Sequence, residues 1–68
     1  MTDKVERMLK RLESCREMLL EVSCDMGIAH DSITETPYQA GLKYVHGKVI
    51  EAEEFLRDFM KSVKEAEK

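Results

Sequence analysis

The sequence predicts an all-α fold: an antiparallel helical hairpin of two long amphipathic helices that pairs with a second copy into a dimeric four-helix bundle. Two segments repeat apolar residues at alternating steps of three and four, the heptad pattern of helices that pack side by side. Helix-start signals precede the second segment, and a turn-like stretch separates the two. Because 68 residues can form only one small core, we expect a single domain over residues 1–68.

The first helix is expected over residues 3–26. Thr2 or Asp3 can cap its N-terminus, and Gly27 can adopt the left-handed conformation that often ends a helix. The residues that face away from the apolar repeat are mostly charged. The repeat itself, which includes Cys15 as a small core residue, consists of Val5, Met8, Leu12, Cys15, Leu19, Val22 and Met26.

The second helix is expected over residues 37–66, with Thr36 as N-cap, Pro37 at the first helical position and Gln39 at the third. Gly41 and Gly47 either weaken this helix or allow a neighbouring helix to approach closely. Residues 27–36 are then a loop that reverses the chain. The second apolar repeat consists of Leu42, Val45, Val49, Ala52, Leu56, Phe59, Val63 and Ala66.

Further apolar residues widen both repeats. A two-helix hairpin needs only one apolar seam, whereas a four-helix bundle needs a broader face on each helix. A chain this short also buries little surface by itself. We therefore expect a homodimer whose self-association residues are Leu9, Met18, Phe55 and Met60. The rival interpretation is that this strip binds a different protein and that the free chain is monomeric.

Composition limits the classes of partner and compartment. Charged residues form 37% of the chain, the net charge is −3 and the pI is about 5.3, so the surface is mixed and mildly acidic. Such a balance argues against a dedicated nucleic-acid binder. No apolar run is long enough to span a membrane, and no signal peptide is visible. Two cysteines are too few for a disulfide framework, so we expect a soluble cytoplasmic protein.

No residue pattern indicates catalysis or metal binding. His30 and His46, even with Cys24 or Asp31, match no ligand spacing. No phosphate-binding loop, nucleophile motif or inward carboxylate pair occurs. We therefore expect no enzyme, no cofactor and no metal. Cys24 is expected on the outer face, and its redox role is left open.

The expected function is that of a small non-enzymatic regulatory or inhibitory protein that binds and masks a surface of a larger protein. A phage-encoded protein directed at a host protein is one form of this hypothesis. The acidic residues of the second helix, Glu51, Glu53, Glu54 and Asp58, are by default a solvated face. Exposed apolar residues that cluster mark an interface. The predicted partner-binding residues are Tyr44, Ile50, Glu51, Glu54 and Asp58.

The alternative function is nucleic-acid binding by a basic face of the first helix. The first sixteen residues hold five basic and three acidic side chains, a net charge of +2. No aromatic residue lies among them to stack on bases. This alternative face consists of Lys4, Arg7, Lys10 and Arg11.

The chain resembles the Rop-type RNA-binding proteins in length and heptad layout. That resemblance implies a dimeric four-helix bundle and RNA binding, but none of that family's RNA-contacting residues is carried over to this sequence. The short helical-hairpin phosphatases that act on aspartyl phosphate are similar in size. Their Ser-Gln-x-x-Asp motif has no counterpart here.

Overall fold

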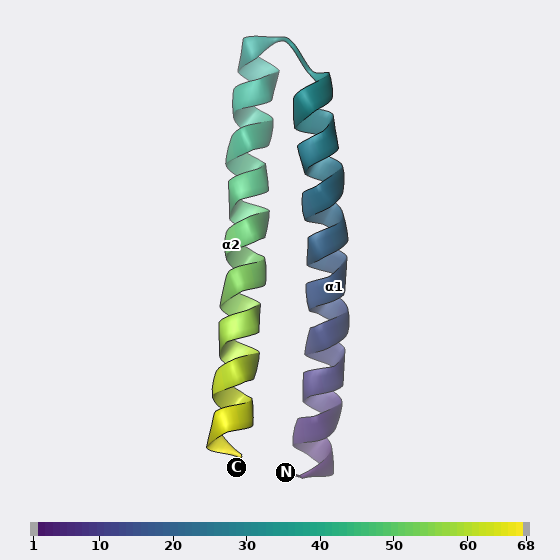
Figure 1. The fold of residues 1–68 in the computed structure, drawn as a ribbon, viewed down its shortest axis with the longest axis vertical. Coiled ribbons are helices and arrows are strands. Elements are labelled where there is room, and N and C mark those ends of the chain that lie inside the picture. Colours follow the sequence, from purple (N-terminus) through teal and green to yellow (C-terminus); the bar gives the residue numbers. More distant parts are fainter. Residues whose placement is uncertain (1, 68) are drawn as a thin grey trace.

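The computed structural model describes residues 2–67, which form two long helices lying side by side and running in opposite directions (Figure 1). Helix α1 spans Asp3–Ser32 and helix α2 spans Thr36–Ala66. The hairpin is a rod with extents of 50 × 15 × 12 Å. No strand occurs between residues 2 and 67. The predicted all-α hairpin is confirmed.

Helix α1 begins as predicted but ends later. Thr2 is its N-cap, and the Thr2 hydroxyl accepts a hydrogen bond from the Val5 amide at 3.2 Å. The helix does not stop at Gly27, which has no positive φ, but continues to Ser32. The prediction of a loop over 27–36 was therefore wrong, and the connection is only residues 33–35. Packing explains the longer helix, since Gly27 lies against α2, where an added Cβ would be 3.6 Å from the His46 ring.

Helix α2 begins within one residue of its predicted start. Glu35 occupies the N-cap position without a side-chain cap, so Thr36 is the first helical residue instead of the cap. The Gln39 side chain is used differently from the prediction. It donates to the carbonyl oxygens of Ile33 at 3.0 Å and His30 at 3.4 Å. Because the last carbonyls of a helix have no partner within it, Gln39 ties the start of α2 to the end of α1.

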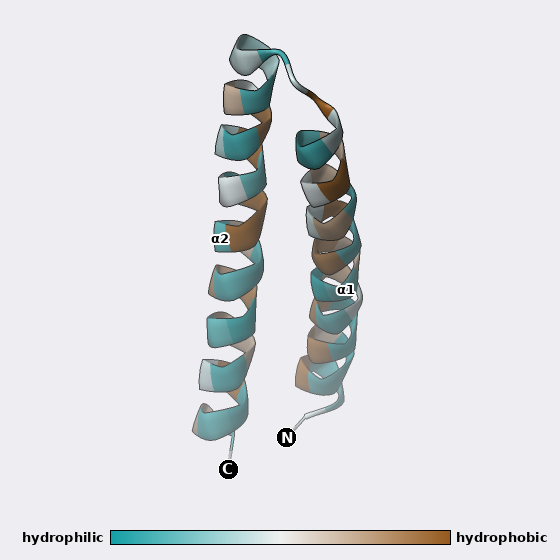
Figure 2. Ribbon diagram, turned by 45° about the horizontal axis from the view of Figure 1, so that its top comes forward, coloured by the Kyte–Doolittle hydropathy of each residue, from teal (hydrophilic) through white to brown (hydrophobic). Residues whose placement is uncertain are grey.

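The contact between the helices, called the seam below, uses only half of each predicted apolar repeat. In Figure 2 the hydrophobic segments of α2 lie on its side turned toward α1. The most covered residues again alternate steps of three and four. On α1 the seam consists of Val5, Leu9, Leu12, Arg16, Leu19, Ser23, Met26 and His30; on α2 it consists of Gln39, Leu42, His46, Val49, Glu53, Leu56, Met60 and Val63.

The other half of the predicted seam is exposed, and this part of the prediction was wrong. Residues one position later in the sequence lie between the helices instead. Two of them, Leu9 and Met60, are 8% and 4% exposed. Others are polar and form hydrogen bonds across the seam. Two packed helices can cover only one side of each other. The hairpin therefore covers the seam residues and leaves the second apolar strip exposed. The exposed members are Met8, Cys15, Val22, Val45, Ala52, Phe59 and Ala66.

Two cross-seam contacts define the register. Arg16 pairs with Glu53, and Ser23 pairs with His46. A step of seven residues forward in α1 is thus matched by seven residues backward in α2. The same register places Leu9 opposite Met60, the only buried apolar side chains among residues 2–67.

Candidate interaction surface

One broad side of the hairpin, over the described residues, is an apolar strip that the packing of the two helices leaves exposed. We call it the open face and define it as Met8, Cys15 and Val22 of α1 with Val45, Ala52 and Phe59 of α2. Each member directly precedes a seam residue, so each is turned about 100° from the seam in the same rotational sense. Since the helices are antiparallel, that rotation brings both strips to the same side.

The exposed fractions show how much of the open face remains accessible. They are 36% for Met8, 44% for Val22, 47% for Val45 and 52% for Phe59. Cys15 is also exposed, which corrects its predicted place in the core of the hairpin. Large exposed apolar patches are typical of interaction sites, so the open face is the candidate interaction surface.

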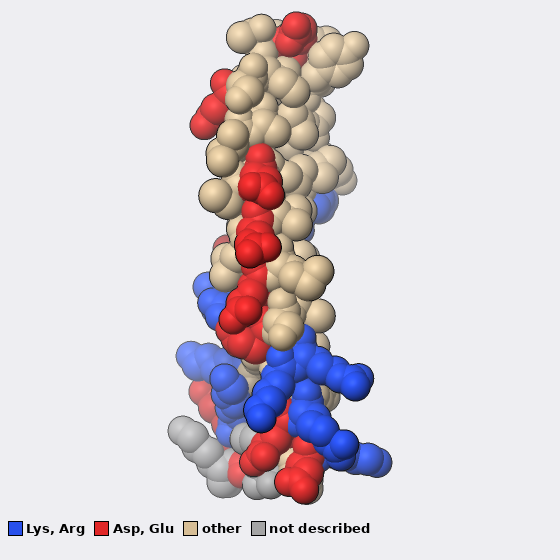
Figure 3. Space-filling view, turned by 90° about the vertical axis from the view of Figure 1, so that its right-hand side faces the viewer, with Lys and Arg blue, Asp and Glu red and all other residues tan. Residues whose placement is uncertain are grey.

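The α1 edge of the open face is basic. A shallow hollow of about 450 Å³, called the basic hollow, is lined by Lys4, Arg7, Met8, Arg11 and Leu12. Three of the four residues proposed for nucleic-acid binding therefore come together here, while Lys10 does not line this hollow. Figure 3, which views the α1 side of the rod, shows basic side chains gathered toward the end that carries the termini and an acidic stripe farther up.

The outer side of α2, which adjoins the open face at Phe55, is acidic. A hollow of about 380 Å³ is lined by Glu51, Glu54, Phe55 and Asp58, which we call the acidic ridge. Phe55 is 75% exposed among these carboxylates. In the register of the hairpin, Asp58 lies level with Arg11 along the rod, on the opposite outer edge. The Asp58 carboxylate lies 3.6 Å from the guanidinium of the neighbouring Arg57.

The remaining members of the predicted partner-binding set lie outside the open face. Tyr44 is 68% exposed, and the Lys48 ammonium lies 5.4 Å from its ring centre. Ile50 is 40% exposed and follows the seam residue Val49, so it is turned toward the broad side opposite the open face. Ile50 lies one turn before Glu54, so this broad side adjoins the acidic ridge at Glu54.

The predicted self-association residues divide into two groups. Met18 and Phe55 are 64% and 75% exposed and flank the open face. Leu9 and Met60 are buried between the helices of the hairpin and present no surface to a second copy. The heptad assignment missed this because it selected Met8 and Phe59, one residue earlier, for the seam.

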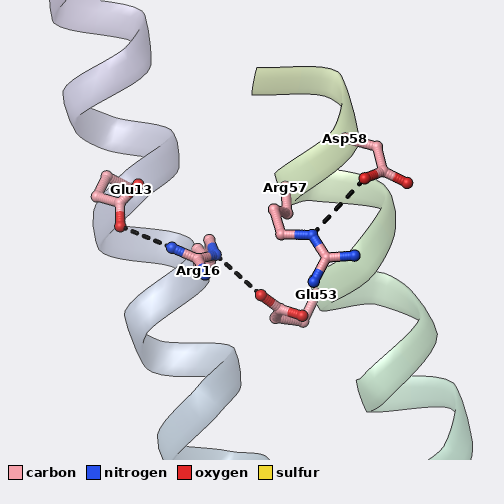
Figure 4. Close-up of polar contacts among 5 residues, drawn as sticks. All are labelled: Glu13, Arg16, Glu53, Arg57 and Asp58. Atoms are coloured by element: carbon pink, nitrogen blue, oxygen red, sulfur yellow. Dashed lines mark hydrogen bonds and ion pairs between the residues drawn. The ribbon is translucent and has the colours of Figure 1, made fainter. Parts of the chain in front are cut away.

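A polar layer crosses the middle of the seam (Figure 4). The Arg16 guanidinium donates to the Glu53 carboxylate at 2.8 Å and to Glu13 at 3.1 Å. The hydrogen bond to Glu53 raises the pKa of Arg16 against an opposing effect of desolvation, and the charge of Glu13 adds to the rise. Glu53, expected on a solvated face, is only 8% exposed. Its carboxylate is held by a structural ion pair.

Both histidines form contacts within the hairpin. His46 bonds to the Ser23 hydroxyl at 3.0 Å within the seam, and His30 lies in the last turn of α1, not in the loop where it was expected. Its Nδ1 is 3.4 Å from the Asp31 carboxylate. Within residues 2–67 no group of three or more His, Cys, Asp and Glu side chains could hold a metal ion. Cys24 is exposed, as expected.

The fold and this surface define a helical hairpin with one covered and one uncovered apolar side.

Neither helix, over the residues described, has an apolar stretch long enough to cross a membrane. No protein-family model matches the chain, and neither the curated proteins nor the solved structures contain a significant match to it.

Proposed function

We propose that this chain is a non-enzymatic protein-binding module that self-associates through its open face and, as a dimer, binds and regulates a larger protein. The observation that supports it is the incomplete core. Leu9 and Met60 are the only buried apolar side chains among the described residues, while an apolar strip of similar length stays exposed. Other copies of the same chain are present wherever the protein is made, so a second copy can cover the open face without any other protein.

Burial of the open face in a dimer contributes a free energy comparable to the cost of association. Met8, Val22, Val45 and Phe59 retain between 36% and 52% of their exposure. Since full burial of such a side chain contributes about 1.5–3 kcal/mol, covering the exposed part contributes about 1 kcal/mol each. Eight such side chains in a symmetric dimer contribute about 8 kcal/mol, within the range of association costs of about 4–15 kcal/mol. The exposed Met18 and Phe55 at the edges add to this.

Analytical ultracentrifugation at about 10–100 μM tests self-association. We expect wild-type chain to sediment at twice the 7.9 kDa chain mass and Phe59→Glu to sediment as a monomer. Leu20→Glu places the same charge at an exposed apolar residue of the opposite broad side and is expected to leave the dimer intact. A wild-type monomer over the whole range contradicts the self-association.

The surface proposed for the larger protein lies away from the open face and includes Tyr44 and Ile50. A tagged chain from its native host should retain a second protein at fixed stoichiometry. Ile50→Glu should lose that protein while remaining dimeric, and Lys10→Ala should keep it. Loss of the dimer in Ile50→Glu, or retention of the protein by it, counts against this surface.

The second candidate function is nucleic-acid binding, which is supported by the basic residues gathered near one end of the rod in Figure 3. Fluorescence anisotropy with mixed-sequence duplex DNA and single-stranded RNA tests it. Submicromolar affinity that falls steeply with salt would favour this candidate over protein binding. We expect weak binding, because the acidic ridge and the acidic stripe on α1 repel phosphates.

A further inference from the structure

We propose that the second copy covers the open face in one arrangement, with both connecting segments at the same end of the four-helix assembly. In this dimer, α1 of each copy packs beside α2 of the other. The inference rests on the self-association proposed above and adds its geometry. Two hairpins that stack face to face about a two-fold axis have only one alternative, in which the connecting segments lie at opposite ends and like helices are neighbours.

The two edges of the open face are complementary in the same-end arrangement. A two-fold axis along the rod keeps every residue at its own level, so the Arg11 end of the basic hollow in one copy faces the Asp58 end of the acidic ridge in the other. By the register of the hairpin, Arg11 of one copy is then level with Asp58 of the second. Lys4 is likewise level with Glu65, and Glu21 with Lys48. All three pairs are opposite in charge, and each occurs twice in the dimer.

The shapes of the edges agree with their charges. The basic hollow has apolar residues, Met8 and Leu12, between its cations. On the acidic ridge the highly exposed Phe55 stands between carboxylates. In the same-end dimer, Phe55 of the second copy lies near the level of Leu12, where an apolar ring can pack while the surrounding charges pair.

The opposite-end arrangement provides less complementarity at the edges. With α2 beside α2 and the two-fold axis at the middle of α2, Glu51 lies level with Glu51 of the second copy, and Asp58 lies level with Tyr44. Arg11 does approach the level of Asp25, so this arrangement is not without attraction. Because salt screens exposed charges over about 8 Å, the pairs at the contact decide the choice of arrangement more than the distribution of charge along the rod.

Charge exchange at Arg11 and Asp58 tests the contact directly. In the same-end dimer, Arg11→Glu opposes two carboxylates in its own homodimer, and Asp58→Arg opposes two guanidinium groups. When the two variants are mixed, both contacts of the mixed dimer become opposite in charge. We expect each variant alone to dimerise roughly tenfold more weakly than wild type and the mixture to recover wild-type affinity.

Matched controls separate this effect from net charge. Lys10→Glu and Glu17→Arg make the same charge changes at exposed residues of α1 outside the two edges, and we expect near-wild-type dimers from each alone. Weakening by Arg11→Glu and by Asp58→Arg alone, with recovery in their mixture, supports the inference when both controls dimerise like wild type alone and mixed. Variants that weaken the dimer without recovery on mixing, or that leave it unchanged, overturn it.

A distance measurement tests the arrangement without altering either edge. A spin label at Thr34→Cys, in a chain that also carries Cys15→Ala and Cys24→Ser, marks the connecting segment. In the same-end dimer the two labels lie closer than half the 50 Å length of the rod, whereas opposite ends separate them by about that length. If the labels lie about 50 Å apart while Phe59→Glu is monomeric in sedimentation, the same-end arrangement is wrong but self-association through the open face is retained. A wild-type monomer removes both.

Discussion

Met8 and Leu9 are neighbours in the sequence but lie on different surfaces, so truncating each to alanine separates the seam from the open face. Leu9 is 8% exposed and lies opposite Met60, whereas Met8 is 36% exposed on the open face. The heptad pattern alone assigns the opposite roles. The two substitutions therefore test which strip holds the hairpin together.

The expected cost for Leu9→Ala follows from the buried side chain. It removes three carbons at about 0.8 kcal/mol each, or about 2.5 kcal/mol, before any cavity is counted. Because the seam is open to solvent along its edges, the neighbours can relax and the cost should stay near the lower end of about 2–5 kcal/mol. For a domain of this size that corresponds to a Tm lower by about 10–20 °C. Met8→Ala should cost the isolated hairpin well under half as much.

Urea unfolding followed by circular dichroism measures both variants at about 1 μM and 100 μM chain. Leu9→Ala should be less stable at both concentrations. Met8→Ala should show most of its loss at the high concentration, where the dimer forms. Equal losses from the two variants at the low concentration would refute the seam described here and restore the heptad assignment.

Three further outcomes are expected. Gly47→Ala should stabilise the chain by about 1 kcal/mol in thermal unfolding, because an added Cβ meets nothing within 4 Å and the residue is helical; a loss of stability would indicate a helix packed against that position. Thr2→Ala should cost about 1 kcal/mol, since the hydroxyl caps α1, while no change would show that the cap is frayed in solution. Glu53→Ala should lower Tm clearly more than Glu54→Ala, because it leaves Arg16 without its seam partner; equal effects of the two would contradict a stabilising role of this half-buried ion pair.

The positions of the helices could be predicted from the sequence, because heptad spacing and the residues before α2 are local signals. The end of α1 could not. Gly27 is a common helix terminator, but its effect is overridden by packing against His46, a residue nineteen positions away in the sequence. The use of Gln39 as a link to the end of α1 likewise depends on where the two helices meet.

The seam was half predicted for a related reason. Hydrophobicity ranks Met8 and Phe59 above Arg16 and Glu53 as core residues. The structure instead places the charged pair between the helices, since each member satisfies the other there. A sequence pattern scored residue by residue does not register that two polar residues on different helices match. The candidate surface was therefore recognised as apolar and wide, but its location was shifted by one residue on each helix.

The polar contacts across the seam also specify how far the two helices can slide. A displacement by one heptad would keep Leu12 and Leu19 facing apolar residues, so those contacts barely distinguish correct from incorrect alignment. The same displacement would set Arg16 against Met60 or His46 and strand Glu53 opposite Ser23 or Leu9, leaving a covered charge without its counterion. The aliphatic residues thus ensure that the helices associate, and a guanidinium and a carboxylate determine the one alignment in which they do so.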